Sequence, residues 1–409
     1  MSVVILYDKK QQKTVNDNLI ELDLDDLESF GNYRHGETFL KIPSMKVKGK
    51  TIVEWFALND VSFWWFASPV IHPRFKEATL FIDRLSSFLV QNSVKTIILR
   101  GSYDKASIVK QICQLNNIRF ETYRWSYLIF SVKRIITTFL KKFVYKRITQ
   151  SKFKKRLKCY NKQGYEKLPQ EYTLIVSPGL YRRETIDPES GKIKKVEFFL
   201  QPILDLLKKN NIPTLCMDVD YTFRGKVDVL KERLGTEYAW MPIEILLDKQ
   251  KSNFVTKSVQ SLKQSLLELK RGNINDIFIY KNIRLWQYLE PVFSDLFLEP
   301  YLPTFLHLIE RMEEFLRETK PKVIIQLYET GPYAKAIELA ARKLRIKTIG
   351  IQHGLIPSDT PDYIFFEGIS ETSHLGNIIP DRTFVFGEQY YRLLTKKSTY
   401  PPNRVSIIG

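Results

Sequence analysis

Two β-rich runs separated by a helical pattern decide the fold: Val323-Ile-Ile-Gln-Leu-Tyr-Glu329 and Lys347-Thr-Ile-Gly-Ile-Gln-His-Gly354. Each run is a short apolar stretch with β-branched residues, which is typical of a buried strand. Between them, apolar side chains recur at helical spacing over residues 333–344. Because two parallel strands need a crossover connection, this strand-helix-strand order predicts a parallel βαβ unit.

The same alternation continues outward along the chain. It predicts a Rossmann-like α/β fold with mostly parallel sheets. Further strands are expected at residues 51–56, 96–99, 118–123, 173–176, 214–219, 277–279, 363–366 and 383–386. Further helices are expected at residues 75–90, 105–115, 195–209, 261–270 and 301–318. Residues 405–409 are expected to form one more strand or a connector.

One basic segment interrupts this alternation. No acidic residue occurs between Glu121 and Glu166. Residues 126–165 contain 12 Lys and Arg side chains and so contribute +12 of the chain's net charge of +18. The remaining residues are therefore almost balanced. This predicts an N-terminal α/β region over residues 1–125, a basic amphipathic helical insertion over 126–165, and a Rossmann-like domain over 166–409.

On a helix, the basic segment places apolar side chains on one arc: Leu128, Val132, Ile135, Ile136, Phe139 and Phe143. A basic amphipathic helix of this kind binds anionic membranes. The cations expected to contact the membrane are Lys133, Arg134, Lys141, Lys142, Lys152, Lys154, Lys155, Arg156 and Lys158. The alternative is a packed helix with a solvated basic face. No nucleic-acid partner is expected, because the remaining chain is nearly neutral and shows no nucleic-acid module.

The number of cysteines and the length of the apolar runs indicate where in the cell the protein is located. Cys113, Cys159 and Cys216 are odd in number and far apart, so we expect neither a disulfide framework nor a zinc site. The chain shows no signal-peptide pattern and no apolar run of about 18–20 residues. We therefore expect a cytoplasmic protein, peripheral on the inner face of the cell membrane.

The polar residues that end the two quoted strands are the candidate catalytic groups. The carboxyl ends of parallel strands are where open α/β sheets bind ligands, so Glu329 and His353 are expected to be neighbours there. The His353 imidazole can act as a general base, flanked by Gln352 and Gly354 as substrate-binding residues. The alternatives are a structural histidine and a carboxylate that caps the helix after Glu329.

Three further motifs have weaker interpretations. Asp218-Val-Asp220 matches a metal-binding Asp-x-Asp pattern, but three-residue matches arise by chance. We therefore expect these acids to cap a loop or face the cleft, and we expect no metal. In Ser177-Pro-Gly-Leu-Tyr-Arg-Arg-Glu184, Gly179 permits a tight turn, and Arg182 or Arg183 can meet a phosphate, although a solvated turn is the preferred interpretation. Phe63-Trp-Trp-Phe66 is expected in the core, with sugar stacking or lipid insertion as alternatives.

These residues together carry a resemblance. The Gln352-His-Gly strand end, the later Asp381-Arg-Thr-Phe-Val-Phe-Gly-Glu388 and the final Val405-Ser-Ile-Ile-Gly409 resemble the amino-terminal half of GT-B glycosyltransferases of surface or capsular polysaccharide synthesis. The similarity to CDP-glycerol glycerophosphotransferases and UDP-N-acetylglucosamine 2-epimerases is more distant. The resemblance to GT-B glycosyltransferases covers residues 323–409 well, residues 173–279 loosely and the first 125 residues hardly at all.

The resemblance implies the function. We expect transfer of a sugar from a nucleotide-sugar donor to a lipid-linked glycan, with His353 as base, Glu329 assisting it and Glu388 among the substrate-binding residues. No tightly bound cofactor is expected. A C-terminal nucleotide-binding domain, in the same or another chain, would complete the donor site, so this chain alone is expected to be inactive. The alternative is a non-catalytic acceptor-binding or membrane-docking subunit.

Overall fold

The computed structural model describes residues 2–7, 19–23, 35–100, 103–122, 124–160, 171–186, 191–220, 225–247, 252–365 and 375–408. The chain divides into two compact units. The first comprises Met1–Phe56, Ala67–Phe143 and Gln264–Leu296, and the second comprises Ala57–Phe66, Val144–Lys263 and Phe297–Gly409. This division differs from the linear one expected from the charge pattern, because segments distant in the sequence return to each unit.

The first unit contains a four-stranded parallel sheet in the order β2-β1-β7-β8. Its strands are β1 (Ser2–Tyr7), β2 (Leu19–Asp23), β7 (Val94–Arg100) and β8 (Arg119–Thr122). Its helices include α1 (His35–Lys41), α2 (Ile52–Trp55), α4 (Ala106–Leu115) and α9 (Trp286–Asp295). It also holds the two-residue hairpins β3 (Lys46–Val47) with β4 (Lys50–Thr51) and β14 (Ile279–Tyr280) with β15 (Ile283–Arg284).

Three long helices contribute residues to both units. They are α3 (Trp64–Gln91), α5 (Arg124–Leu157) and α8 (Asn253–Arg271). Helix α5 begins two residues before the predicted basic segment and ends inside it, so residues 126–157 of that segment are helical, as predicted. No helix in the described part of the chain is both long and apolar enough to span a membrane.

The second unit contains a seven-stranded, all-parallel sheet in the order β13-β12-β9-β16-β17-β18-β19. Its strands are β9 (Thr173–Pro178), β12 (Thr214–Val219), β13 (Ala239–Pro242), β16 (Val323–Leu327), β17 (Lys347–Ile351), β18 (Arg382–Val385) and β19 (Val405–Ile407). Counted along the chain, this is the order 3-2-1-4-5-6-7 of doubly wound α/β sheets. The Rossmann-like α/β prediction is therefore compatible with the structure.

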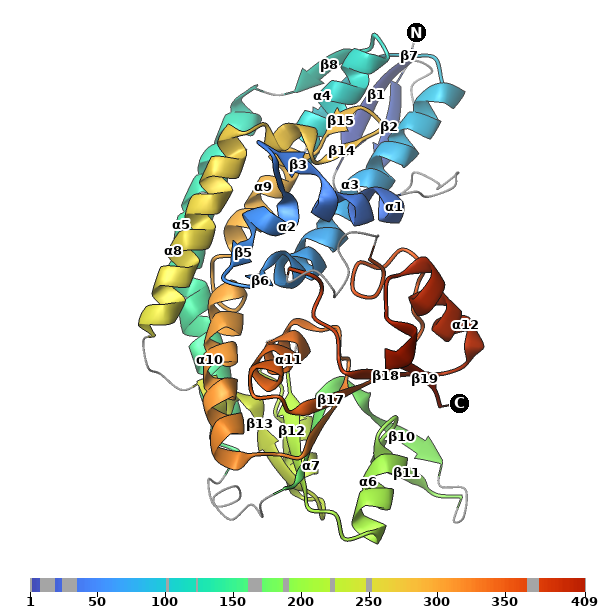
Figure 1. Cartoon of the computed structure of the whole chain (residues 1–409). Helices are drawn as coiled ribbons and strands as arrows, with labels where there is room; N and C mark the ends of the chain where they lie inside the picture. Colours follow the sequence, from blue (N-terminus) through green and yellow to red (C-terminus); the bar gives the residue numbers. More distant parts are fainter. Residues whose placement is uncertain are drawn as a thin grey trace. The chain divides into compact units, whose positions relative to one another are not determined.

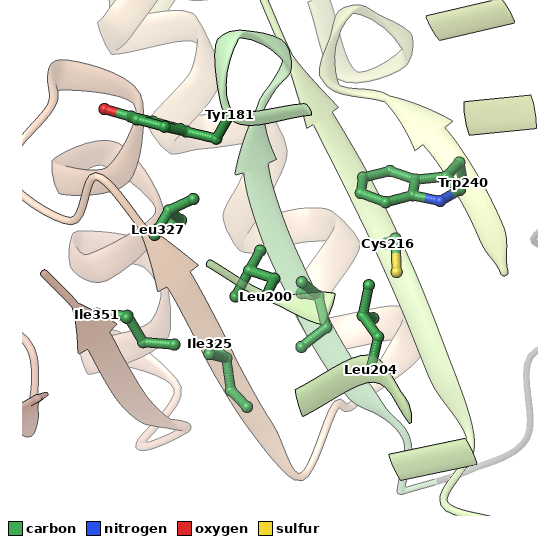
Figure 2. Close-up of a cluster of buried hydrophobic side chains, with 9 residues drawn as sticks. Tyr181, Leu200, Leu204, Cys216, Trp240, Ile325, Leu327 and Ile351 are labelled. Atoms are coloured by element: carbon green, nitrogen blue, oxygen red, sulfur yellow. The ribbon is translucent and has the colours of Figure 1, made fainter. Parts of the chain in front are cut away.

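Helices cover both faces of this sheet, which explains why its central strands are buried almost throughout. Helix α6 (Gln201–Lys209) packs on one face through Leu200 and Leu204, against Ile175, Cys216 and Ile325. Figure 2 shows this cluster, with Tyr181 at the carboxyl-end side of the strands above Leu327. Figure 1 shows α10 (Leu302–Thr319) beside α11 (Pro332–Lys343), which in turn contacts β17. The remaining elements are α7 (Asp228–Leu234), α12 (Glu388–Arg392) and the hairpins β5 (Ala57–Leu58) with β6 (Val61–Ser62) and β10 (Arg182–Ile186) with β11 (Ile193–Glu197).

Several strand and helix predictions are confirmed, and others differ from the structure. The strand predicted at residues 277–279 overlaps only Ile279 of the two-residue strand β14. Residues 51–56 form helix α2, because Thr51 and Glu54 make a reciprocal capping box that outweighs the β-branched residues. Residues 193–197 pair as strand β11, so the helix predicted from residue 195 begins only at Gln201. Residues 363–365 form no strand, since the Ser398 hydroxyl bonds the backbone of Tyr363 and Phe365 instead. Residue 366 lies outside the described residues.

Candidate active site

The sheet order of the second unit fixes where a ligand is expected. The order reverses between β9 and β16, and doubly wound sheets bind ligands at the carboxyl ends of such strands. Glu329 follows β16 and His353 follows β17, the neighbouring parallel strand. Tyr181 follows β9 on the other side of the reversal. The sequence prediction that the two candidate catalytic residues end neighbouring strands is confirmed.

Tyr363 connects the two candidate catalytic side chains. Its hydroxyl donates a hydrogen bond to Oε1 of Glu329 at 2.9 Å and lies 3.3 Å from Nδ1 of His353. A phenol has a single proton, so a Tyr363 hydroxyl that donates to Glu329 can accept from an Nδ1–H. That arrangement leaves Nε2 of His353 unprotonated. None of the hydrogen bonds among the described residues engages Nε2.

Backbone strain occurs at this site. Tyr328, just before Glu329, has φ +65°, a left-handed conformation that a bulky residue adopts at a cost of about 1–3 kcal/mol. Its ring meets the His353 imidazole edge to face, with centroids 4.6 Å apart. Gly331 makes room for this ring, because a Cβ there would lie 2.7 Å from a ring carbon of Tyr328. Such conformations cluster at functional sites.

Burial sets the charge state of the two catalytic candidates. Glu329 is fully buried, and burial raises the pKa of its carboxyl to about 8, with hydrogen bonding from Tyr363 opposing the rise and Glu338 adding to it. Burial also lowers the pKa of His353 to about 4. The imidazole is therefore neutral at physiological pH, which is the form that accepts a proton. A nearby carboxyl with a raised pKa is characteristic of sites that transfer protons.

Aromatic rings extend from His353 toward the surface. Tyr181 packs edge to face on the imidazole with centroids 5.5 Å apart and on Phe199 at 5.7 Å. Phe199 in turn stacks on Phe386 and meets Phe198 edge to face. Phe198 and Phe386 are exposed. A neutral imidazole beside exposed aromatic faces suits a ligand with both hydroxyl groups and apolar C–H faces, such as a sugar.

Gln352 and Gly354 have different surroundings. The buried Gln352 amide donates to the Gly354 carbonyl at 2.7 Å and accepts from the Phe386 backbone at 2.8 Å, so it holds the loops beside His353 in place. A Cβ at Gly354 would meet no atom within 4 Å. Gly354 therefore borders open space, whereas Gln352 supports the site. A direct substrate contact by either residue stays a prediction.

A buried arginine network occupies the carboxyl ends of β9 and β12. Arg233 pairs with Asp218 and with Glu197, whose Oε1 lies 2.9 Å from its Nε. Arg156 pairs with the same Asp218 and with Glu244, 2.8 Å away. We use the name arginine network for Arg156, Arg182, Glu197, Asp218, Arg233 and Glu244. Burial raises the pKa of Glu244, and the Arg156 guanidinium opposes this effect.

The network explains the remaining motif residues. Asp218 bonds two guanidinium groups, and Asp220 accepts from the Gly225 and Lys226 backbone, so the Asp-x-Asp acids support the fold. Arg182 is held between Glu197 and Glu232. Gly179 lies against Asp218 and Val229, and Glu388 is exposed and paired with Arg392. Among the described residues, no three His, Cys, Asp or Glu side chains group as metal ligands would.

The residues assigned to a membrane surface fall into different environments. Arg156 is buried in the arginine network, so its assignment to a membrane contact was wrong. Lys141 pairs with Asp295 at 2.7 Å. Lys133, Lys154, Lys155 and Lys158 are exposed, and Lys152 is half-buried. The side chains of Arg134, Ile135, Phe139 and Lys142 lie outside the described residues.

Two pockets in the second unit differ in size. The one at the carboxyl ends of β9, β12 and β16 measures about 20 Å³, the space of a single water. A pocket of about 330 Å³ is lined by α5, α8 and α10 residues, including Lys146, Lys154 and Glu299. It contains none of His353, Tyr363 and Glu329, which we call the His353 cluster. We place the candidate site at His353 because the perturbed groups, the strained backbone and the strand order coincide there.

The phenylalanine and tryptophan motif has a structural role. Phe63, Trp64, Trp65 and Phe66 are all buried, as the core interpretation predicted. The Trp65 indole donates to the Leu375 carbonyl at 2.9 Å, and the buried Lys335 ammonium donates to the Trp65 carbonyl at 3.1 Å. Burial lowers the pKa of Lys335 to about 8.

Sequence reasoning missed the tyrosines of the site. Tyr181 and Tyr328 lie within motifs that end predicted strands, but the sequence predicts no role for their rings because tyrosine is common in protein cores. Tyr363 was assigned to a strand. The available signal was the position of Tyr181 and Tyr328 directly after strand runs, where side chains reach the carboxyl edge of the sheet.

Comparison with known proteins adds no family assignment, because no family model matches the chain and no curated protein matches it significantly.

Proposed function

We propose that the second unit is the acceptor-side half of a glycosyltransferase, which moves a sugar from a nucleotide-sugar donor to a hydroxyl of a glycan. The single observation that carries the proposal is the hydrogen-bonded series His353, Tyr363 and Glu329 at the carboxyl edge of a doubly wound sheet. The resemblance of residues 323–409 to GT-B glycosyltransferases points to the same chemistry.

The proposed reaction assigns a role to each member of the series. Nε2 of His353 takes the proton of the acceptor hydroxyl, whose oxygen forms a bond to the anomeric carbon while the bond to the nucleoside diphosphate breaks. The imidazolium that results is stabilised by its Nδ1–H bond to Tyr363, which is bonded to Glu329. Tyr363 and Glu329 are thus positioning residues that act through His353.

The acceptor is proposed to lie on the aromatic rings near His353. The exposed rings of Phe198 and Phe386 and the edge-to-face Tyr181 supply apolar faces for sugar C–H groups. The pocket of about 20 Å³ at the strand ends cannot hold a nucleotide, which needs a cavity of roughly 300 Å³ or more. We therefore propose that the donor nucleotide binds to a further domain, in the same or another chain.

A transfer assay tests the proposal. Tagged protein would be isolated with its partners from its own cells and incubated with a panel of nucleotide sugars labelled on the sugar, plus glycan and glycolipid extracts from those cells. Label transfer should accompany release of nucleoside diphosphate. His353→Ala should lower the turnover number by about 10² to 10⁴, the contribution of a general base.

The matched control is His307→Ala on α10, which removes a histidine of the same unit that lies outside the cluster. It should leave turnover within about twofold of the unmodified protein. Unchanged turnover in His353→Ala would make His353 a structural residue. Binding of glycan without any transfer by the partnered protein would favour the non-catalytic acceptor-binding alternative.

A further inference from the structure

The exposed face of helix α5 carries large apolar side chains. Ile129, Val132, Ile136, Leu140 and Phe143 are each between 52% and 65% exposed. Exposed apolar residues that occur singly are normal, but a contiguous series on one element marks an interaction surface. We call these five residues the apolar stripe.

Helical geometry aligns the apolar stripe. Its members are separated by three, four, four and three residues, so they follow one line along the helix. At 1.5 Å per residue, the line from Ile129 to Phe143 is roughly 21 Å long. The sequence-derived arc also contained Ile135 and Phe139 but lacked Ile129 and Leu140. The structure therefore identifies a different set of apolar residues for this face.

The same spacing continues into cations. Arg147, Lys154 and Lys158 follow Phe143 at helical intervals and are exposed, and Lys133 is exposed beside the stripe. No acidic residue occurs on α5. Lys158 directly follows the last residue of the helix. The surface is thus apolar in its first part and positively charged after it.

We propose that this face of α5 docks on an anionic lipid membrane, with the apolar stripe in the acyl boundary and Lys133, Arg147, Lys154 and Lys158 at the headgroups. An anionic lipid membrane matches both the apolar stripe and the cations, because acyl chains accept the stripe and anionic headgroups attract the cations. A nucleic acid would match the cations and leave the stripe in water. A second copy would cover the stripe but would gain nothing from the cations.

The docking proposal does not rest on sugar transfer, since lipid binding is measured without any donor or acceptor. The full chain would be sedimented with vesicles of phosphatidylcholine alone and with vesicles that also contain phosphatidylglycerol, an anionic lipid that attracts surface cations. We expect at least tenfold stronger binding to the anionic vesicles. Salt should weaken this binding only in part, because screening acts on the cations and spares the inserted stripe.

Two variants separate the two parts of the surface. The apolar variant combines Ile129→Gln, Val132→Gln, Ile136→Gln and Leu140→Gln, and the cation variant combines Lys133→Gln, Arg147→Gln, Lys154→Gln and Lys158→Gln. Each should lower binding to anionic vesicles at least tenfold. The binding that remains in the apolar variant should vanish at 1 M salt, and that of the cation variant should be insensitive to salt.

Matched controls change equally exposed residues elsewhere. The apolar control combines Leu115→Gln, Ile186→Gln, Ile193→Gln and Leu206→Gln, residues that are 56% to 72% exposed. The cation control combines Lys110→Gln, Lys194→Gln, Lys209→Gln and Lys257→Gln, four exposed lysines. Both controls should bind like the unmodified chain. Circular dichroism and thermal melting establish that every variant is folded.

Several outcomes would overturn the proposal. Equal binding to both vesicle types, no binding to either, or equal loss in the variants and their controls would each do so. If the chain binds duplex nucleic acid more tightly than anionic vesicles, nucleic acid is the partner of this face. A dimer of the unmodified chain that the apolar variant abolishes, seen by light scattering in the absence of vesicle binding, would identify a second copy as the occupant.

Discussion

The arginine network and the His353 cluster are both buried polar groups at the carboxyl edge of the same sheet, yet their charges are arranged differently. In the network, Asp218 and Glu197 each contact guanidinium groups. In the cluster, Glu329 has a phenol and an imidazole nearby, and its Oε2 is buried without a hydrogen bond. Removing one partner of a buried charge pair destabilises a fold, whereas a buried acid without a cation has a raised pKa. The cluster is the one suited to moving protons.

The largest effect should come from breaking the network. Arg233→Leu would leave Asp218 and Glu197 buried with one cation fewer, so we expect a loss of about 3–5 kcal/mol in the free energy of unfolding. Urea denaturation measures it. Arg183→Leu is the control, because this arginine lies over the Tyr181 and Phe198 rings and does not belong to the arginine network. A loss below about 1 kcal/mol in Arg233→Leu would show that the network does not need its charge balance.

The next effect concerns the pH dependence of stability. Because the pKa of Glu329 rises from 4.5 to about 8 on folding, only the unfolded chain releases this proton between those values. The group therefore lowers the free energy of unfolding as pH rises through this window, by up to about 1.4 kcal/mol per pH unit. Glu329→Gln should remove this slope and gain a few kcal/mol over the unmodified chain at pH 8.

His353 supplies a control of opposite sign. Its pKa falls from 6.5 to about 4 on folding, so its contribution to stability is complete above pH 6.5 and is lost as pH falls toward 4. His353→Gln should flatten that acidic limb and leave the Glu329 slope in place. Urea midpoints from pH 4 to pH 9 test both, and curves for Glu329→Gln parallel to those of the unmodified chain would contradict the buried-acid interpretation.

Two glycines test how tightly the cluster is packed. A Cβ at Gly350 would lie 2.5 Å from Cγ of Glu329 and 2.8 Å from Cγ of Pro380, so Gly350→Ala should cost about 1–3 kcal/mol. A Cβ at Gly354 meets nothing within 4 Å, so Gly354→Ala should change stability by less than about 0.5 kcal/mol. Thermal melting distinguishes them. Equal effects would mean that the loop after His353 is packed as closely as the strand before it.

A small effect on stability should come from Tyr363→Phe, which removes only a hydroxyl. We expect a loss of about 1 kcal/mol in the free energy of unfolding. If Tyr363 positions His353, the turnover number should fall even under conditions in which the variant is fully folded. The pH profile of turnover should also shift. An unchanged pH profile with a normal turnover number would make Tyr363 a structural residue.

The sequence by itself predicted the parallel strands and the pair of strand ends that carry Glu329 and His353. Strands β12 and β16 follow the predicted residues because their β-branched, apolar runs are local signals that survive in any α/β context. The juxtaposition of the two strand ends follows equally from local order, since a strand, a crossover helix and a second strand form neighbouring parallel strands.

Only the tertiary structure decided which polar residues are buried and with whom. Arg156 stands among exposed lysines in a basic run, and its burial depends on Asp218 and Glu244, which are distant in the sequence. Tyr363 reaches Glu329 and His353 because a loop returns to the sheet edge, a path that periodicity does not encode. Local sequence patterns specify which residues can form a strand or a helix, whereas the pairing of buried charges depends on long-range packing and is settled only when the chain has folded.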